Sequence, residues 1–116
     1  MNNISLLGRI GNDIELRTTT SGKSIVSFPL AVARAYVNKG EERKTDWLDC
    51  VAFGTTAEFI NKYFRKGNSI GLTGSVQTEN YTDKDGKNRK SVRVYVNNVY
   101  FVEKKAEEPD DDDLPF

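Results

Sequence analysis

Two aromatic side chains lie close together in a stretch of alternating apolar character. Trp47 and Phe53 are six residues apart within residues 46–53, so in an extended strand both rings point to the same side. The opposite side of that strand carries the apolar side chains that a core needs, namely Leu48, Cys50 and Ala52. The two rings are therefore available to stack on flat groups outside the core, such as nucleobases, whose π-faces are common to every base.

Two tyrosines extend this set of candidate stacking residues. Tyr36 ends one expected strand and Tyr81 another, and both lie beside loops that could fold over a groove. Their hydroxyls could also contact phosphates. The alternative for all four rings is burial in the core, and that is what we expect for Tyr63 and Phe64, which lie on the apolar stripe of the expected helix.

The charges of the chain are balanced in number but not in position. Seventeen basic residues offset seventeen acidic ones. Residues 1–102 carry fifteen basic and ten acidic side chains, a net charge of +5, whereas residues 103–116 carry two and seven, a net charge of −5. A mildly basic body suits a polyanion, although scattered solvated charges would give the same count.

Neither catalysis nor metal binding is indicated. The chain has no histidine, which is the commonest general base and metal ligand. Asp46 and Asp49 are three residues apart on an expected strand, so they point to opposite sides and make a poor metal pair. We expect a binding protein without enzymatic activity, cofactor or metal. The single cysteine, Cys50, and the lack of a signal peptide or membrane span predict a cytoplasmic protein.

Apolar alternation predicts five strands. The first runs over residues 3–17 and bends at its glycines, the second begins at Ile25 and ends at Tyr36, and the third covers residues 46–53. The fourth runs from Ile70 to Tyr81, and an Asp85-Gly86 turn leads into a return strand that ends near Val102. Gly74 permits a bend in the fourth strand.

One helix is expected between the third and fourth strands. Ala57, Ile60 and Phe64 form an apolar stripe over residues 56–66. Thr55 to Glu58 matches a capping box and Gly67 suits the position after the helix. Three strands, a helix and two strands form the order of the OB-fold, so we predict an all-β, five-stranded OB-fold barrel over residues 1–103.

The residues also resemble those of a known family, the bacterial single-stranded DNA-binding proteins. The matching segments, in order along the chain, are Asn3–Gly11, Asp13–Arg17, Thr45–Trp47, Phe53–Gly54, Tyr63–Gly67, Tyr81–Asp83 and Asp112–Phe116. Each segment is a weak signal, but the ordered set is highly specific.

The resemblance implies an OB-fold, assembled as a homotetramer, that binds and protects single-stranded DNA without sequence preference in replication, recombination and repair. The bases would stack on Trp47, Phe53, Tyr81 and Tyr36. Five basic residues lie near an aromatic candidate or match a basic family position, and we expect them to contact phosphates: Arg9, Arg34, Lys66, Lys90 and Arg93. The expected location is the nucleoid, in the cytoplasm of a bacterial or phage-infected cell.

The chain departs from the family pattern at several positions. Tyr36 and Tyr81 stand where the family often has tryptophan, and the strand before Tyr81 carries Gln77, Glu79 and Asn80 where relatives are often basic. The linker from Lys104 to Pro109 is short. These departures point to weaker phosphate contact or a smaller footprint on DNA.

Residues 104–116 form a short linker and an acidic tail. The segment Glu107–Asp113 has no apolar side chain to bury, so we expect it to be disordered. The docking residues would be Asp110, Asp111, Asp112, Asp113, Leu114, Pro115 and Phe116. Four aspartates before an apolar terminal ring suit a basic pocket with a hydrophobic slot on a replication or repair protein. A solubility tail would explain the aspartates but not the terminal Leu-Pro-Phe.

Two other functions remain open from the residues alone. An RNA-binding or protein-interaction OB module has the same fold, and stacking by itself does not distinguish RNA from DNA. A metal-dependent nuclease would need converging carboxylates, which the pattern does not offer.

Overall fold

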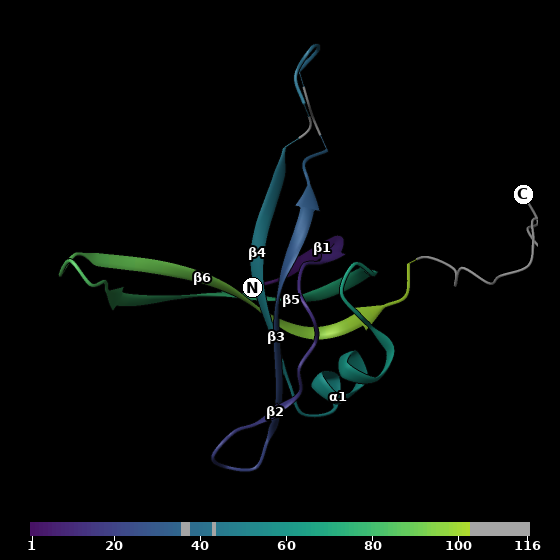
Figure 1. Cartoon of the computed structure of the whole chain (residues 1–116), viewed down its shortest axis with the longest axis vertical. Helices are drawn as coiled ribbons and strands as arrows, with labels where there is room; N and C mark the ends of the chain where they lie inside the picture. Colours follow the sequence, from purple (N-terminus) through teal and green to yellow (C-terminus); the bar gives the residue numbers. More distant parts are fainter. Residues whose placement is uncertain (36–37, 43, 103–116) are drawn as a thin grey trace, which may run out of the picture.

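The computed structural model describes residues 1–35, 38–42 and 44–102, which fold into a β-barrel with one helix. In chain order the elements are β1 (Ile4–Ile10), β2 (Arg17–Thr18), β3 (Ser24–Ala33), β4 (Thr45–Phe53), α1 (Gly54–Tyr63), β5 (Ser69–Thr82) and β6 (Asn88–Tyr100). Figure 1 shows the β3–β4 pair crossing the β5–β6 pair, with α1 packed beside the crossing.

Five strands of the described chain close into a ring in the order β1-β5-β6-β4-β3. The ring closes because β3 also pairs with β1, at Arg9–Ala31 and Ile10–Leu30. Neighbouring strands are antiparallel except β4 and β6, which run parallel over three residue pairs that begin at Asp49–Arg93. The short β2 adds to the edge of β3. The expected five-stranded OB-like barrel, with its helix between the third and fourth long strands, is confirmed.

The core follows the alternation of the strands. Val26, Phe28 and Leu30 of β3 are buried and lie opposite the inward side of β4, where Cys50 and Ala52 are buried. α1 contributes buried Ala57 and Ile60, and Phe64 just after it is 2% exposed. Burial, with a smaller effect of the Asp49 charge, raises the pKa of the Cys50 thiol to about 12. Cys50 is therefore an apolar core residue and not a nucleophile.

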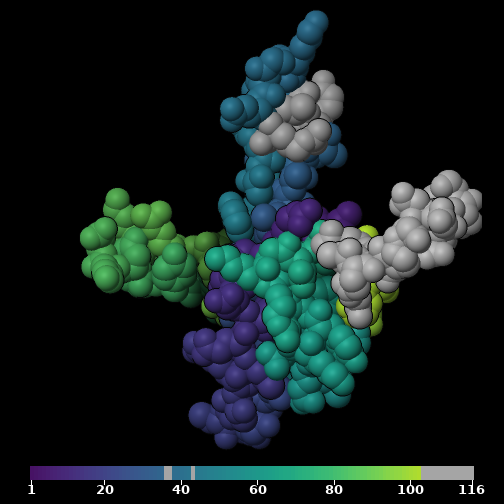
Figure 2. All heavy atoms as spheres, turned by 45° about the vertical axis from the view of Figure 1, so that its right-hand side comes forward, coloured from purple at the N-terminus to yellow at the C-terminus, as the bar shows by residue number. Residues whose placement is uncertain are grey.

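The β3–β4 and β5–β6 pairs extend beyond the barrel as arms, which Figures 1 and 2 show as projections from a central body. β5 pairs with β1 only as far as Gly74, so its remaining residues and the start of β6 form a two-stranded arm. The β5–β6 register shifts between Thr73 and Gly74. A Cβ added at Gly74 would collide with the backbone oxygen of Tyr95. Gly74 therefore allows the bulge at which the arm leaves the barrel.

The first strand is shorter than expected. β1 ends at Ile10 and the chain is irregular from Gly11 until β2 begins at Arg17. The break has a physical cause, because Ile10 and Gly11 turn their backbone groups to other segments. The Gly11 N–H donates to the carbonyl of Pro29 (2.9 Å), and the Ile10 carbonyl accepts from the Gly67 N–H (2.8 Å).

The helix limits also differ from the expectation. α1 runs over Gly54–Tyr63 and has no side-chain cap, so the expected capping box is wrong. Glu58 instead accepts a hydrogen bond from the Ser24 hydroxyl (3.0 Å), which ties the helix to β3. Phe64 is extended and ends the helix, and it is buried as expected. Tyr63 is 48% exposed, so its expected burial is wrong, because its ring packs beside those of Phe59 and Phe101 at the surface.

Candidate nucleic-acid interface

The outward face of β4 brings the two strongest ring candidates to one surface of the barrel. Trp47 is 62% exposed and Phe53 is partly buried. Asp49 and Val51 lie between them on the same side, and the register places outward residues of both neighbouring strands beside them. These neighbours are Ile25, Ser27, Pro29 and Ala31 on β3, and Arg93 and Tyr95 on β6.

The Trp47 ring rests on the turn that follows β1. An added Cβ at Gly11 would lie 2.6 Å from Trp47 Cζ3 and 3.1 Å from Pro29 Cγ. One edge of the indole is thus in contact with backbone, while most of the side chain is open to solvent. This contact gives an exposed ring a defined position, which reduces the entropy cost of stacking.

Phe53 forms a second aromatic platform together with Tyr95. Their ring centroids are 6.0 Å apart and the planes differ by 21°, which is a stacked arrangement. The Lys23 ammonium lies 5.8 Å from the Phe53 centroid on the loop before β3. Sequence reasoning missed Tyr95, although the alternation of Val92, Val94 and Val96 would have placed it on the outward face of β6.

A hollow of about 350 Å³ lies between these two platforms. The outward residues that line it are Ile25, Ser27, Pro29, Asp49, Val51 and Arg93, together with Asn12 from the segment after β1. We call this hollow, with Trp47 at one end and the Phe53–Tyr95 pair at the other, the β4 groove. It offers stacking surfaces at both ends and a guanidinium between them.

Tyr81 lies on the β5–β6 arm, on the same side as the groove. It is 51% exposed and faces Arg89 across the arm, while Gln77 faces Arg93. Because residues two apart on a strand share a side, Tyr81, Arg89 and Arg93 form one row that leads into the β4 groove. The arm therefore continues the groove with a third exposed ring.

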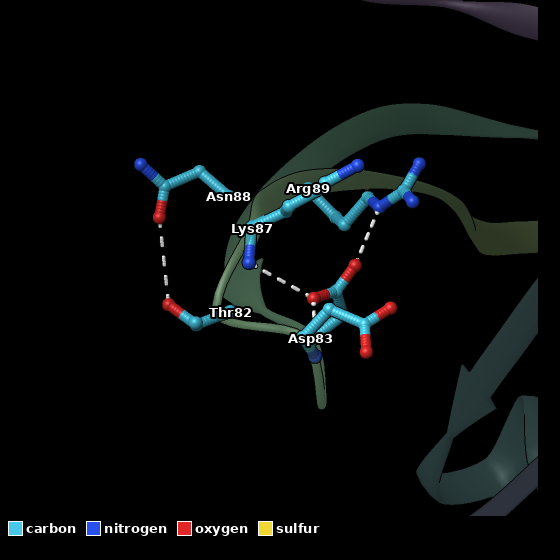
Figure 3. A network of polar contacts seen from close by, with 6 residues as sticks. Thr82, Asp83, Lys87, Asn88 and Arg89 are labelled. Atoms are coloured by element: carbon cyan, nitrogen blue, oxygen red, sulfur yellow. Dashed lines mark hydrogen bonds and ion pairs between the residues drawn. The ribbon is translucent and has the colours of Figure 1, made fainter.

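The tip of this arm is held by Asp83 (Figure 3). One carboxylate oxygen accepts from the backbone N–H groups of Asp85 and Lys87 (both 2.9 Å), and the other accepts from Arg89 Nε (2.8 Å). The Arg89 hydrogen bond, aided by these N–H groups, lowers the pKa of Asp83 below its usual value. Gly86, at φ +82°, completes the expected hairpin turn.

The basic residues expected to contact phosphates lie on different surfaces of the structure. Arg93 lines the groove. Arg9 points outward from β1 and pairs with Ala31, which in turn pairs with Trp47 on β4. The Arg9 guanidinium donates to the carbonyl of Gly67 (3.0 Å), and exposed Lys66 precedes Gly67 in the chain. Lys90 pairs with Asn80, and its position in the alternation puts it on the opposite face of the arm from Tyr81.

Arg34 already has an acidic partner. Its Nε and one terminal nitrogen donate to the two carboxylate oxygens of Asp46, both at 3.0 Å. This bidentate pair raises the pKa of Arg34 and lowers that of Asp46, mainly through the side-chain hydrogen bond. Tyr36 and the acidic tail (104–116) lie outside the described residues.

Two kinds of feature are absent from the part of the chain that the structure describes. Within residues 1–35, 38–42 and 44–102, no group of three or more His, Cys, Asp or Glu side chains is arranged to hold a metal ion. Nor does any helix in this part of the chain have the length and apolar character to cross a membrane.

Comparison with known proteins gives matches along most of the chain. Residues 1–102 match the model of the Single-strand binding protein family. The Single-stranded DNA-binding protein 1 of Staphylococcus aureus (strain MSSA476) is 39% identical over 114 residues, which cover 98% of this chain and 73% of that protein. The Single-stranded DNA-binding protein 2 of Listeria monocytogenes serovar 1/2a is 39% identical over 105 residues, 90% of this chain and 66% of that one.

A solved structure supports the fold independently. The Plasmodium falciparum SSB complex with ssDNA superposes with a TM-score of 0.78 at 24% sequence identity, covering 89% of this chain and 96% of that chain. At this identity the likeness shows that the two chains share one fold.

Proposed function

The chain belongs to the single-strand binding protein family, and from this premise we propose that it holds single-stranded DNA in the β4 groove. It binds unpaired DNA without sequence preference, in replication, recombination and repair. The names of the family and of the relatives describe binding and no reaction, in line with the sequence expectation.

The observation that carries the assignment to the β4 groove is that the exposed Trp47 ring and the Phe53–Tyr95 stack lie on the same outward face of β4, on either side of the hollow in the strand register. A protein that accepts any sequence uses the π-faces of bases, because base edges differ. Loss of one stacking ring costs about 1–3 kcal/mol per base, a range that comes in part from proteins of this same family. Tyr81 on the arm would take a base beyond the groove.

Charge at the groove supports a path for the backbone. Arg93 lies within the groove and Arg9, with Lys66 beside it, lies past Ala31 on the Trp47 side. We place phosphates along these three side chains. Arg34 would contact DNA while it holds Asp46, and Lys90 faces away from the groove.

The test uses the fluorescence of Trp47, which is the only tryptophan of the chain. Addition of a mixed-sequence single-stranded oligonucleotide should quench its emission, and the affinity should decrease with added salt because phosphate contacts release counterions. A Trp47→Phe variant should still bind, measured by oligonucleotide anisotropy. Equal affinity for a duplex of the same sequence would contradict the assignment, and a matched RNA strand distinguishes an RNA-binding module.

We also propose that the protein is a homotetramer. β1 pairs with β3 only at its last two residues, so the edge of Ile4–Gly8 is open. Leu7 is 60% exposed there, beside a hollow of about 530 Å³ that Ala31, Ala33 and Val102 help to line. An open edge with apolar side chains suits association with a second copy. The mass in solution, with and without a long oligonucleotide, tests this.

Recruitment of replication and repair proteins by the acidic tail remains a proposal that rests on the sequence. The Asp110–Asp113 run and the terminal Leu114-Pro115-Phe116 suit a basic pocket with an apolar slot. Pull-down of replication proteins from a bacterial lysate by the full chain, but not by a chain lacking Leu114–Phe116, is the expected result. We place this activity in the cytoplasm, at the nucleoid.

A further inference from the structure

An acidic side chain lies inside the β4 groove, where a DNA-binding surface would be expected to be basic or neutral. Asp49 is exposed on the outward side of β4 and lines the hollow between Trp47 and the Phe53–Tyr95 pair. Its strand neighbours are Pro29 and Arg93. Within the described residues its carboxylate takes part in no hydrogen bond and no ion pair, so both oxygens can accept from a ligand.

The position of this carboxylate decides what it can contact. Phosphates would be repelled from it. Trp47 lies two residues from Asp49 on the same side of β4, so a base stacked on that ring would lie within reach of the carboxylate. An ionised carboxylate accepts hydrogen bonds and donates none. It therefore favours a base edge that carries an amino group and disfavours one that carries a carbonyl oxygen at the same place.

We propose that Asp49 forms a base-edge subsite in the β4 groove that favours bases with an exocyclic amino group, cytosine, adenine or guanine, over thymine and uracil. The inference rests on the groove being the DNA site, and it adds a mild base preference to a protein that otherwise accepts any sequence. Arg93 beside it holds the backbone, so the pair separates the base side of the strand from its phosphate side.

The test compares deoxycytidine and deoxyuridine homopolymers of equal length at neutral pH, because these two bases differ only at position 4 and in the proton on N3. Asp49→Asn and Asp49→Ala should each reduce the preference for deoxycytidine over deoxyuridine by about tenfold or more relative to the wild type, as expected for loss of a hydrogen bond to a charged acceptor. The asparagine amide can also donate to the uracil carbonyl.

The matched control is Glu79→Gln. Glu79 is exposed on the groove side of the arm, opposite Ser91, but does not line the groove. Its loss removes the same charge and should strengthen binding of both homopolymers equally, leaving their ratio unchanged. Equal strengthening by Asp49→Asn would overturn the subsite and leave Asp49 as a repulsive charge. Absence of any single-strand binding by the wild type would instead overturn the proposed function.

Discussion

Substitution of Gly11 by alanine tests whether the backbone contact sets the position of Trp47. Gly11 does not have a left-handed backbone, so alanine introduces no conformational strain. Its Cβ would lie 2.6 Å from the edge of the indole, and the shortest ordinary contact is 3.4 Å. Pro29 blocks retreat of the backbone, since its Cγ and carbonyl oxygen would be 3.1 and 3.2 Å away. The ring must therefore move outward by about 0.8 Å, the difference between 3.4 and 2.6 Å.

The size of the effect follows from this shift. A gap of 0.5–1 Å removes about a quarter to a half of a van der Waals contact, and a stacked base is worth about 1–3 kcal/mol. The expected loss is about 0.3–1.5 kcal/mol, or about two- to tenfold in affinity for single-stranded DNA. Folding stability should fall by less than about 1 kcal/mol, because the exposed ring can yield.

Two measurements check this, the emission spectrum of Trp47 and the affinity by oligonucleotide anisotropy. The control is Gly22→Ala, because Gly22 has φ +87° and no atom lies within 4 Å of the place that an added Cβ would take. It should lose about 1–2 kcal/mol of stability to backbone strain and leave the emission of free protein unchanged. Unchanged emission and affinity in Gly11→Ala would refute the idea that this contact positions the ring.

Three further outcomes are expected. Phe53→Ala should weaken single-strand binding about tenfold or more in a filter-binding assay, because one platform is lost; wild-type affinity would argue against a groove at β4. Arg93→Gln should make the slope of log affinity against log salt shallower by about 0.7, whereas Lys90→Gln, on the opposite face of the arm, should leave it unchanged. The hydrogen bonds to the Asp83 carboxylate should be fully formed above the usual pKa of aspartate and should be lost as the pH falls through the lowered pKa of Asp83. The readout is the exchange rate of the Lys87 amide, which should rise on acidification in the wild type; Asp83→Asn should not show this rise.

The fold was predictable where one local pattern determines the structure. The period of two in β4 separates Trp47 from Cys50, and the structure exposes the first and buries the second. The Asp85-Gly86 pair likewise predicted the hairpin turn. In both cases the residues that give the signal are neighbours in sequence, so the signal can be read without knowledge of a distant contact.

The differences arise where distant residues compete for the same group. Glu58 fits a capping box, yet its carboxylate bonds to Ser24, which is 34 positions away. Tyr63 lies beside the apolar stripe but packs at the surface against Phe101, whose position depends on how the chain leaves β6. Tyr95 joins the site only because β6 runs beside β4. None of these relations is visible in a local window of sequence.

The parallel seam between β4 and β6 is only three residue pairs long, yet it does two things at once. Together with the β1–β3 pairing it completes the ring of strands, and it brings Arg93 and Tyr95 against the face that carries Phe53. Barrel closure and assembly of the groove are thus a single event, so a bound strand that bridges this seam would oppose its opening by mass action. A nascent chain would acquire its affinity only after its last strand has docked.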